Sequence, residues 1–412
     1  MLIARVMAGA DVSDLAPAFD RMGLSSSARE YLLEKIPALH LLLTGLERED
    51  ARLLRSRSEG GEVPGREEFP SFVPGDQNKR PGSALLSGRR EQMERLASEA
   101  RADGREALAA AIERALRSLG PPPDVVVGGA TWSFGGRLRV MGIVNVTPDS
   151  FSDGGRFFDP EGAIAHGVAL AEAGADMLDV GGESTRPGSG GVPEEEEQRR
   201  VLPVIRGLRE RLPSMPLSID TRKHAVARDA LLAGANFVND ITGFRHDPKM
   251  VEVIAHFGVP CCAMHIQGTP ETMQKQPHYE DAVAEILEYL EESVANATRA
   301  GIPRERVFVD PGIGFGKTFA HNHYLLRRLR DFRLLGQPVL VGPSRKAFLG
   351  ALAGGKPAPE RVLSTTACAA AIVMTGGADV IRVHDVAEVR VAIAVAEAIR
   401  TARDGGTLSA AR

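Results

Sequence analysis

RVMGIVN at residues 139–145 and PEGAIAHGVALAEAGADMLDVG at residues 160–181 decide the fold of this chain. The first run is apolar and suited to a buried strand, whereas residues 160–174 have the length and composition of a helix that ends at Gly174. A second short apolar run, residues 175–181, follows at once. This order predicts two parallel strands joined by a helix, the unit from which α/β folds are built.

The same pattern repeats to the end of the chain. Further strands are predicted at residues 216–220, 236–240, 260–265, 306–310, 338–342 and 379–383, with helices at residues 194–212, 221–234, 279–301 and 385–403. Eight such units in about 275 residues predict an α/β fold of the (β/α)8 TIM barrel type. A doubly wound sheet is the alternative, but it usually has fewer units and a Gly-rich phosphate loop after its first strand.

The first 120 residues have a different character. A segment rich in Gly, Pro and charge, at about residues 59–82, and the run PPPD at residues 121–124 interrupt regular structure. Four segments before the Pro run resemble short strands or amphipathic helices, at residues 39–46, 83–88, 90–103 and 105–119. We therefore predict a small N-terminal α/β extension over residues 1–120, a Pro- and Gly-rich linker with a barrel-capping hairpin over residues 121–134, and the barrel over residues 135–412.

The composition excludes several classes of protein. With 43% hydrophobic and 25% charged residues the chain is typical of a globular protein, not of a disordered or fibrous one. The 50 Lys and Arg nearly balance the 54 Asp and Glu, so no nucleic-acid partner is expected and any phosphate site must be local. No apolar run approaches the roughly 20 residues that span a bilayer, and the first residues make a poor secretory signal. We expect a cytoplasmic protein with no membrane partner.

Nearly every predicted strand carries a polar residue at its carboxyl end. In a barrel these ends surround one mouth, which is where this fold places its active sites. A single Asp there is often only a helix cap, but so many polar positions at one mouth favour a functional site. The positions are Asn145, Asp179, Asp220, Asn239, His265, Asp310, Ser344 with Lys346, and Arg382 with His384.

The polar residues divide by charge into two groups. Asp220, Asn239 and Asp310 are suited to a flat heterocycle that presents ring N–H and amine donors, such as a pterin or purine. Cations around the same mouth suggest a second, anionic group such as a diphosphate or carboxylate. These cations are Lys346, Arg382, His384 and Arg186. We therefore expect a substrate with one planar end and one anionic end.

Three motifs are interpreted as structural. DPGIGFGKT at residues 310–318 resembles a phosphate-binding loop, but Pro311 stands where that pattern needs Gly, so a flexible loop over the ring is favoured. HNH at residues 321–323 is interpreted as a helix cap or an exposed face. EEEEQRR at residues 194–200 places acids before bases at a helix start and is interpreted as a solvated face.

With these residues assembled, the chain closely resembles the dihydropteroate synthases, the folate-pathway members of the pterin-binding barrel family. The matching strings begin at Met141 (MGIVNVTPDSFSDGG), Asp179 (DVGGESTRPGS), Ser218 (SIDT), Asn239 (NDITG), Ala263 (AMHIQGTPETMQ), Asp310 (DPGIGFGK), Val341 (VGPSRKAFLG) and Ile381 (IRVHDV). They cover residues 135–400 in the family's order. Residues 1–120 carry no recognisable motif of a pyrophosphokinase or an aldolase, so no fused second folate enzyme is expected there.

The resemblance implies an activity and its ligands. The family joins 4-aminobenzoate to 6-hydroxymethyl-7,8-dihydropterin diphosphate with Mg2+ and releases pyrophosphate. A homodimer and a role as a sulfonamide target are expected of it. Pro343 in GPSRK departs from many members at a position that bears on affinity for aminobenzoate or sulfonamides. A methyltransferase acting on methyltetrahydrofolate and a non-catalytic pterin-binding protein are the alternatives, and the former would not need the diphosphate pocket.

The resemblance also implies roles for individual residues. It implies catalytic roles for Lys346, Arg382, His384 and Asp220. It implies a pterin site made of Asp220, Asn239, Asp310, Lys346, Arg382, Met264 and Phe315. It implies diphosphate contacts from Asn145, Arg186, Arg382 and His384, with Asn145 also reaching Mg2+. It implies an aminobenzoate site made of Phe151, Thr185, Arg186, Pro187 and Ser344, with Asp153 and Asp179 as loop residues.

Overall fold

The chain divides into two compact units. A computed structural model describes residues 3–7, 39–59, 70–74, 82–146, 159–185 and 189–402. One unit comprises residues 121–333 with 337–402, and the other comprises residues 1–120 with the short segment 334–336. No helix in these described ranges is long and apolar enough to cross a membrane.

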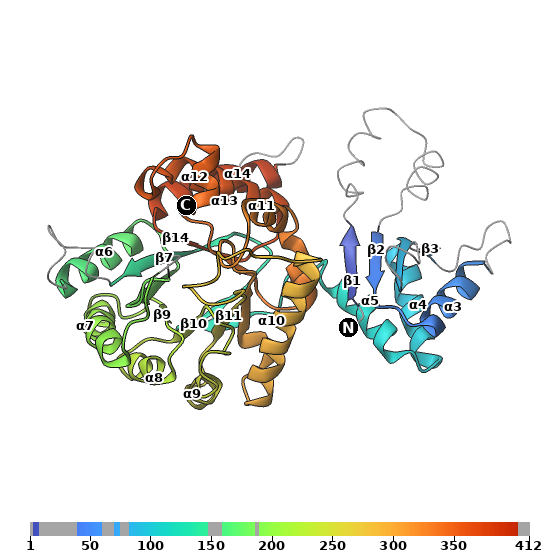
Figure 1. The fold of residues 1–412 in the computed structure, drawn as a ribbon, viewed down its shortest axis with the longest axis horizontal. Coiled ribbons are helices and arrows are strands. Elements are labelled where there is room, and N and C mark those ends of the chain that lie inside the picture. Colours follow the sequence, from blue (N-terminus) through green and yellow to red (C-terminus); the bar gives the residue numbers. More distant parts are fainter. Residues whose placement is uncertain are drawn as a thin grey trace. The chain divides into compact units, whose positions relative to one another are not determined.

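The larger unit is a barrel of eight parallel strands (Figure 1). Its strands are β7 (Arg139–Asn145), β8 (Met177–Gly181), β9 (Leu217–Asp220), β10 (Phe237–Asp240), β11 (Cys261–Met264), β12 (Val307–Asp310), β13 (Leu340–Val341) and β14 (Val380–Val383). They pair in the order β12-β11-β10-β9-β8-β7-β14-β13, and a parallel bridge between Val309 and Val339 closes the ring. All eight strands and the TIM-barrel class predicted from the sequence are therefore confirmed.

Helices surround the strands. They are α6 (Pro160–Glu172), α7 (Glu194–Arg211), α8 (His224–Leu232), α9 (Met250–Phe257), α10 (Ala282–Arg299), α11 (Phe319–Arg327), α12 (Ala347–Leu352), α13 (Val362–Thr375) and α14 (Val386–Thr401). Their ends follow local chemistry. The side chain of Asp281 accepts a hydrogen bond from the Ala284 N–H and so caps the start of α10. Helix α13 ends at Thr375 and is followed by Gly376, whose φ of 63° favours glycine.

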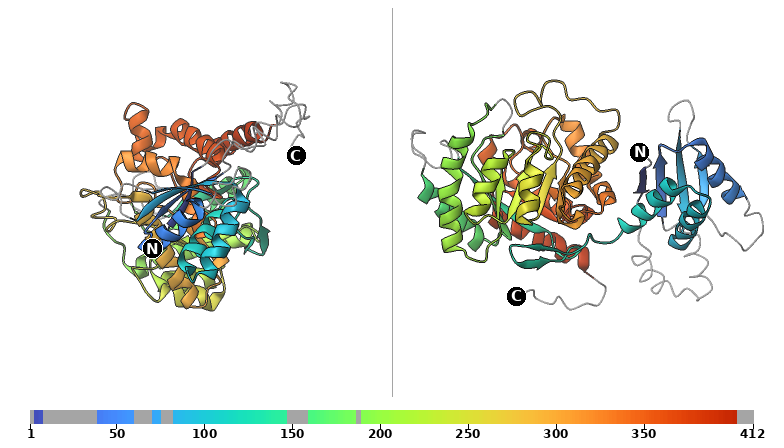
Figure 2. Two further views of the ribbon diagram at one scale, coloured as in Figure 1. Left: turned by 90° about the vertical axis from the view of Figure 1, so that its right-hand side faces the viewer. Right: turned by 90° about the horizontal axis from the view of Figure 1, so that it is seen from below.

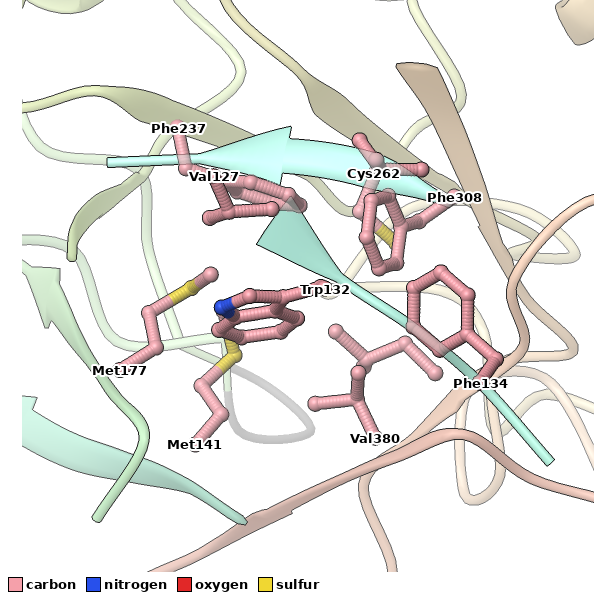
Figure 3. Close-up of a cluster of buried hydrophobic side chains, with 11 residues drawn as sticks. Val127, Trp132, Phe134, Met141, Met177, Phe237, Cys262, Phe308 and Val380 are labelled. Atoms are coloured by element: carbon pink, nitrogen blue, oxygen red, sulfur yellow. The ribbon is translucent and has the colours of Figure 1, made fainter. Parts of the chain in front are cut away.

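The amino end of the barrel is filled by an apolar cluster. The hairpin of β5 (Val125–Val127) and β6 (Ala130–Trp132) lies across this end (Figure 2, right). Trp132 and Phe134 both meet Phe308 of β12 edge to face, with ring centres 6.5 and 5.9 Å apart (Figure 3). The guanidinium carbon of Arg139 lies 4.5 Å from the centre of the Trp132 ring. Because side chains close this end, the opposite, carboxyl end is left for ligands.

The smaller unit has an antiparallel sheet with helices. Its elements are β1 (Ile3–Met7), β2 (Leu39–Thr44), α3 (Arg48–Glu59), β3 (Ser71–Pro74), β4 (Ser83–Gly88), α4 (Arg90–Ala102) and α5 (Glu106–Arg117). The sheet order is β1-β2-β4-β3. The sequence predicted β2, β4, α4 and α5. It missed β1 and α3, and it missed β3 because this strand interrupts a segment rich in Gly, Pro and charge.

Candidate active site

The carboxyl ends of the barrel strands bring polar side chains from distant parts of the sequence together. Asp220 at the end of β9 lies opposite Asn239 of β10 and Gly181 of β8 in the strand register. Asp310 at the end of β12 lies opposite Met264 of β11. The closed barrel therefore places these residues around one mouth, as predicted from the positions of the strand ends.

Arg382 of β14 joins two carboxylates across the barrel. Its Nε donates to Asp179 Oδ2 at 2.5 Å, and a terminal nitrogen donates to Asp220 Oδ2 at 2.7 Å. Asn239 Nδ2 donates to the same Asp179 oxygen at 3.1 Å. Burial raises the pKa of Asp220 to about 7, and the Arg382 charge opposes that shift. Asp220 can therefore hold or release a proton near neutral pH, and in its ionised form it can accept from ring N–H donors.

The resemblance implied that Asp179 is a loop residue, which is wrong, whereas its place in the strand predicted at residues 175–181 is confirmed. It is the third residue of β8 and its side chain has no exposure to solvent. Because β8 continues to Gly181, Asp179 lies one layer deeper than Asp220, opposite Ser218 in the register. It holds Arg382 and Asn239 in place rather than forming part of a mouth loop.

Asp310 and Lys346 at the mouth lie near enough for their charges to influence each other. The backbone N–H of Gly312 donates to Asp310 Oδ1 at 2.7 Å, and burial raises the pKa of Asp310 to about 6. Lys346 Nζ donates to the carbonyl of Ile313 and lies 4.2 Å from the centre of the Phe315 ring. Burial lowers the pKa of Lys346 to about 7. The site thus holds an acid and a base whose charges both change near neutral pH.

The loop that resembles a phosphate-binding motif is packed inward. Lys317 is only 2% exposed, and its Nζ lies 2.9 Å from His265 Nδ1 and 2.9 Å from the Phe315 carbonyl. Burial lowers the pKa of Lys317 well below its usual range. The burial and both contacts hold this lysine inside the protein. The interpretation of the segment as a flexible loop over the ring stays a prediction. The burial of Lys317 was not predicted, because the sequence GFGKT gives no sign of it.

His384 connects two further site residues. Its Nδ1 lies 2.9 Å from Ser344 Oγ, and its backbone N–H donates to the same oxygen at 3.1 Å. Its Nε2 lies 3.5 Å from Asn145 Nδ2 at the end of β7. The structure therefore brings Asn145, Ser344 and His384 together, beside the strand that carries Arg382.

Four of the expected site residues belong to segments that the structure does not describe, and a fifth lies beside one of these segments. Phe151, Asp153, Arg186 and Pro187 lie outside the described residues. Thr185 is described and half-buried just after β8.

Two buried acids near the mouth were not predicted. Asp240, the last residue of β10, is fully buried, and its Oδ1 accepts from the N–H and the hydroxyl of Thr242 at 2.7 Å each. Its position after Asn239 at a strand end was the available signal. Glu197, interpreted as part of a solvated face, is also fully buried. The reason is an ion pair with Lys223, which in turn pairs with Glu183 after β8.

The barrel of this chain is similar to known proteins. The family model described as pterin binding enzyme matches residues 141–384. A dihydropteroate synthase of Synechocystis is 44% identical over 279 residues, covering 68% of this chain and 96% of that protein. A probable bifunctional folylpolyglutamate synthase/dihydropteroate synthase of Haloferax volcanii is 38% identical and covers 94% of this chain but 46% of its own length. The solved structure of Xanthomonas albilineans dihydropteroate synthase with 4-aminobenzoic acid, 45% identical, matches 68% of this chain and all of its own with a TM-score of 0.64.

Proposed function

The chain belongs to the family of pterin-binding enzymes, among the dihydropteroate synthases, and we propose how its residues divide the work of that reaction. The enzyme is a transferase of folate biosynthesis that forms 7,8-dihydropteroate from 6-hydroxymethyl-7,8-dihydropterin diphosphate and 4-aminobenzoate. The observation that carries the proposal is the bridge of Arg382 between Asp179 and Asp220, next to Asn239, at the carboxyl end of the barrel.

The pterin ring is proposed to bind at the buried carboxylates. Asp220 and Asp310 supply acceptors for ring N–H and amine groups, and Asn239 supplies an amide. Burial raises the pKa of Asp220 to about 7 and that of Asp310 to about 6, and above these values both acids are carboxylates that accept from ring donors. Supporting contacts are proposed from Met264, Phe315, Lys346 and Arg382.

The departing diphosphate is proposed to bind beside Asn145, Arg382 and His384. The guanidinium and the imidazole can stabilise negative charge that grows as the C–O bond breaks. The electron-rich ring stabilises the methylene cation that remains. The neutral amine of 4-aminobenzoate then forms the C–N bond to it and gives up one proton to the departed pyrophosphate or to water. No strong base is needed for this attack, because the aromatic amine is already neutral.

Mg2+ is proposed as the metal of this site. The described residues hold no group of three or more His, Cys, Asp or Glu that could bind a metal by themselves. Mg2+ commonly takes few protein oxygens and completes its shell with phosphate oxygens and water, so a single amide such as Asn145 fits this role. When bound, the ion would neutralise charge on the diphosphate.

The aminobenzoate site is proposed to include Ser344 and Thr185, with Phe151, Arg186 and Pro187 from outside the described residues. Ser344 supports the assignment because it lies two residues before Lys346 in the chain and bonds to His384. The product would then form between the two substrate sites.

The domain boundaries, the partner and the cellular location also remain proposals. We propose residues 1–120 as an extension without a catalytic role, residues 121–134 as linker and capping hairpin, and residues 135–412 as the catalytic barrel. A homodimer is supported by an apolar face, because several large side chains of α13 and α14 are more than half exposed: Leu363, Met374, Val391, Val395 and Ile399. A cytoplasmic location is proposed with it.

The test is pyrophosphate release with dihydropterin diphosphate, 4-aminobenzoate and Mg2+. Release should require both the amine and the metal, and dihydropteroate should form in equal amount. Release without the amine would contradict the proposed coupling of the two substrate sites, and release without Mg2+ would contradict the metal assignment. Light scattering of Val395→Asp beside the parent protein tests the dimer, which the new charge should dissociate.

A further inference from the structure

The chain makes an unusual turn between Ser344 and Lys346. Arg345, the residue between them, has a φ of 55°, in the left-handed region that a long side chain rarely adopts. Such a conformation costs energy and persists only where the surroundings hold it from several sides. At this turn the surroundings can be identified.

Helix α13 holds the backbone of the turn. The N–H of Arg345 donates to the hydroxyl of Thr365, a fully buried residue, at 3.1 Å. The carbonyl of Arg345 accepts from a terminal nitrogen of Arg361 at 2.8 Å. Both sides of the strained residue are therefore bonded to the start of one helix, through the residue before α13 and its first turn.

Asp385 holds the side chain of the turn. Arg345 Nε donates to Asp385 Oδ2 at 2.9 Å, and a second guanidinium nitrogen bonds to Oδ1. Two parallel bonds of this kind fix orientation as well as distance. Asp385 is 9% exposed and directly follows His384, which bonds to Ser344. Two adjacent cross-links thus join the segment after β13 to the segment after β14.

We infer that Arg345 and Asp385 are positioning residues for the transfer reaction. The turn at Arg345 determines where Ser344 and Lys346 lie, and the ion pair fixes that turn against His384. The distance between the lysine and the histidine is thereby set before substrate binds. This inference rests on the proposed roles of Lys346 and His384 at the pterin and the departing diphosphate.

The test compares two single variants and their combination in the full chain. Arg345→Gly removes the ion pair but keeps the turn, because glycine adopts a positive φ without strain. Asp385→Asn removes the charge and preserves the shape, although Glu388 also lies near enough to attract the guanidinium. We expect kcat to fall about tenfold or more in Arg345→Gly, and less in Asp385→Asn, because small misplacement of reacting groups is costly. The KM for the pterin diphosphate should change little, since Asp220, Asn239 and Asp310 are untouched.

A double-mutant cycle and a control separate positioning from general stability. If the two residues act through one ion pair, the double variant should be no slower than Arg345→Gly. The control is Arg390→Met, which breaks a comparable pair with Asp176 at the amino end of the barrel. It should lower the melting temperature and leave kcat unchanged.

Two results would overturn the inference. One is a kcat within about twofold of the parent in both single variants, a smaller change than misplacement of reacting groups produces. The other is a loss of kcat that merely follows the loss of melting temperature, as judged against the control. If Arg345→Gly does not fold, Asp385→Asn and Arg345→Lys decide the question by the same criteria. A parent enzyme that releases no pyrophosphate would refute the site roles instead, so the two failures are distinguishable.

Discussion

Replacement of Arg382 by methionine should destabilise the barrel and slow the reaction together. The change leaves Asp179 and Asp220 without their shared counter-ion, and Asp179 is fully buried. Removing one partner from a buried ion pair costs about 3–5 kcal/mol, because an uncompensated charge remains. For a barrel of this size we expect the melting temperature to fall by about 5–10 °C at about pH 8. Loss of a charge-stabilising donor should lower kcat about 10²- to 10³-fold.

The pH dependence of this loss provides a sharper test. Burial already raises the pKa of Asp220 to about 7 with Arg382 present, and removal of the cation raises it further. Between the ordinary pKa of an unfolded aspartate and this raised pKa, the native state keeps a proton that the unfolded chain has released. The free energy of unfolding therefore falls as pH rises through this interval. At pH values below the raised pKa the Asp220 carboxyl is neutral in the variant, so the stability lost through Arg382→Met becomes smaller. Calorimetry of parent and variant at about pH 5.5 and pH 8 measures both effects, and an equal loss at the two pH values would refute the reasoning.

Three further outcomes are expected. Lys346→Ala should abolish most turnover in the pyrophosphate assay with little change in melting temperature, and a near-normal rate would contradict its assigned role. In the parent protein the free energy of unfolding should fall between about pH 4 and pH 6, because burial raises the pKa of Asp310 to about 6 and the native state retains its proton there. Asp310→Asn should make this fall smaller. An unchanged pH profile would show that this acid is not the cause. A fragment of residues 125–412 should stay folded by circular dichroism, whereas insolubility would show that the extension is an obligate part of the barrel.

The architecture of the barrel was predictable because it repeats. Each strand is short, apolar and followed by a helix, so errors at one unit do not affect the next. The position of the active site followed from the same pattern, since the carboxyl ends of parallel strands in a barrel meet at one mouth. In the N-terminal extension the strands are antiparallel and unequal in spacing, and β1 and β3 were missed there.

Pairings inside the site were not predictable from the sequence. Arg382 lies 203 residues from Asp179 and 162 residues from Asp220 in the sequence, and nothing in the spacing of these residues selects one partner over another. Glu197 shows the same limit, because an acid run at a helix start is usually solvated. Its burial depends on Lys223, which reaches it from another strand end. The left-handed turn at Arg345 likewise depends on contacts with α13 and Asp385.

The hairpin that closes the amino end of the barrel also gives the protein a built-in optical reporter. Trp132 is the only tryptophan of the 412 residues, and it is 3% exposed within the apolar cluster around Phe308. Its native emission should therefore lie at short wavelength and shift to the red when water reaches the ring. Because residues 1–120 contain no tryptophan, this emission follows unfolding of the barrel alone, even in the full-length chain.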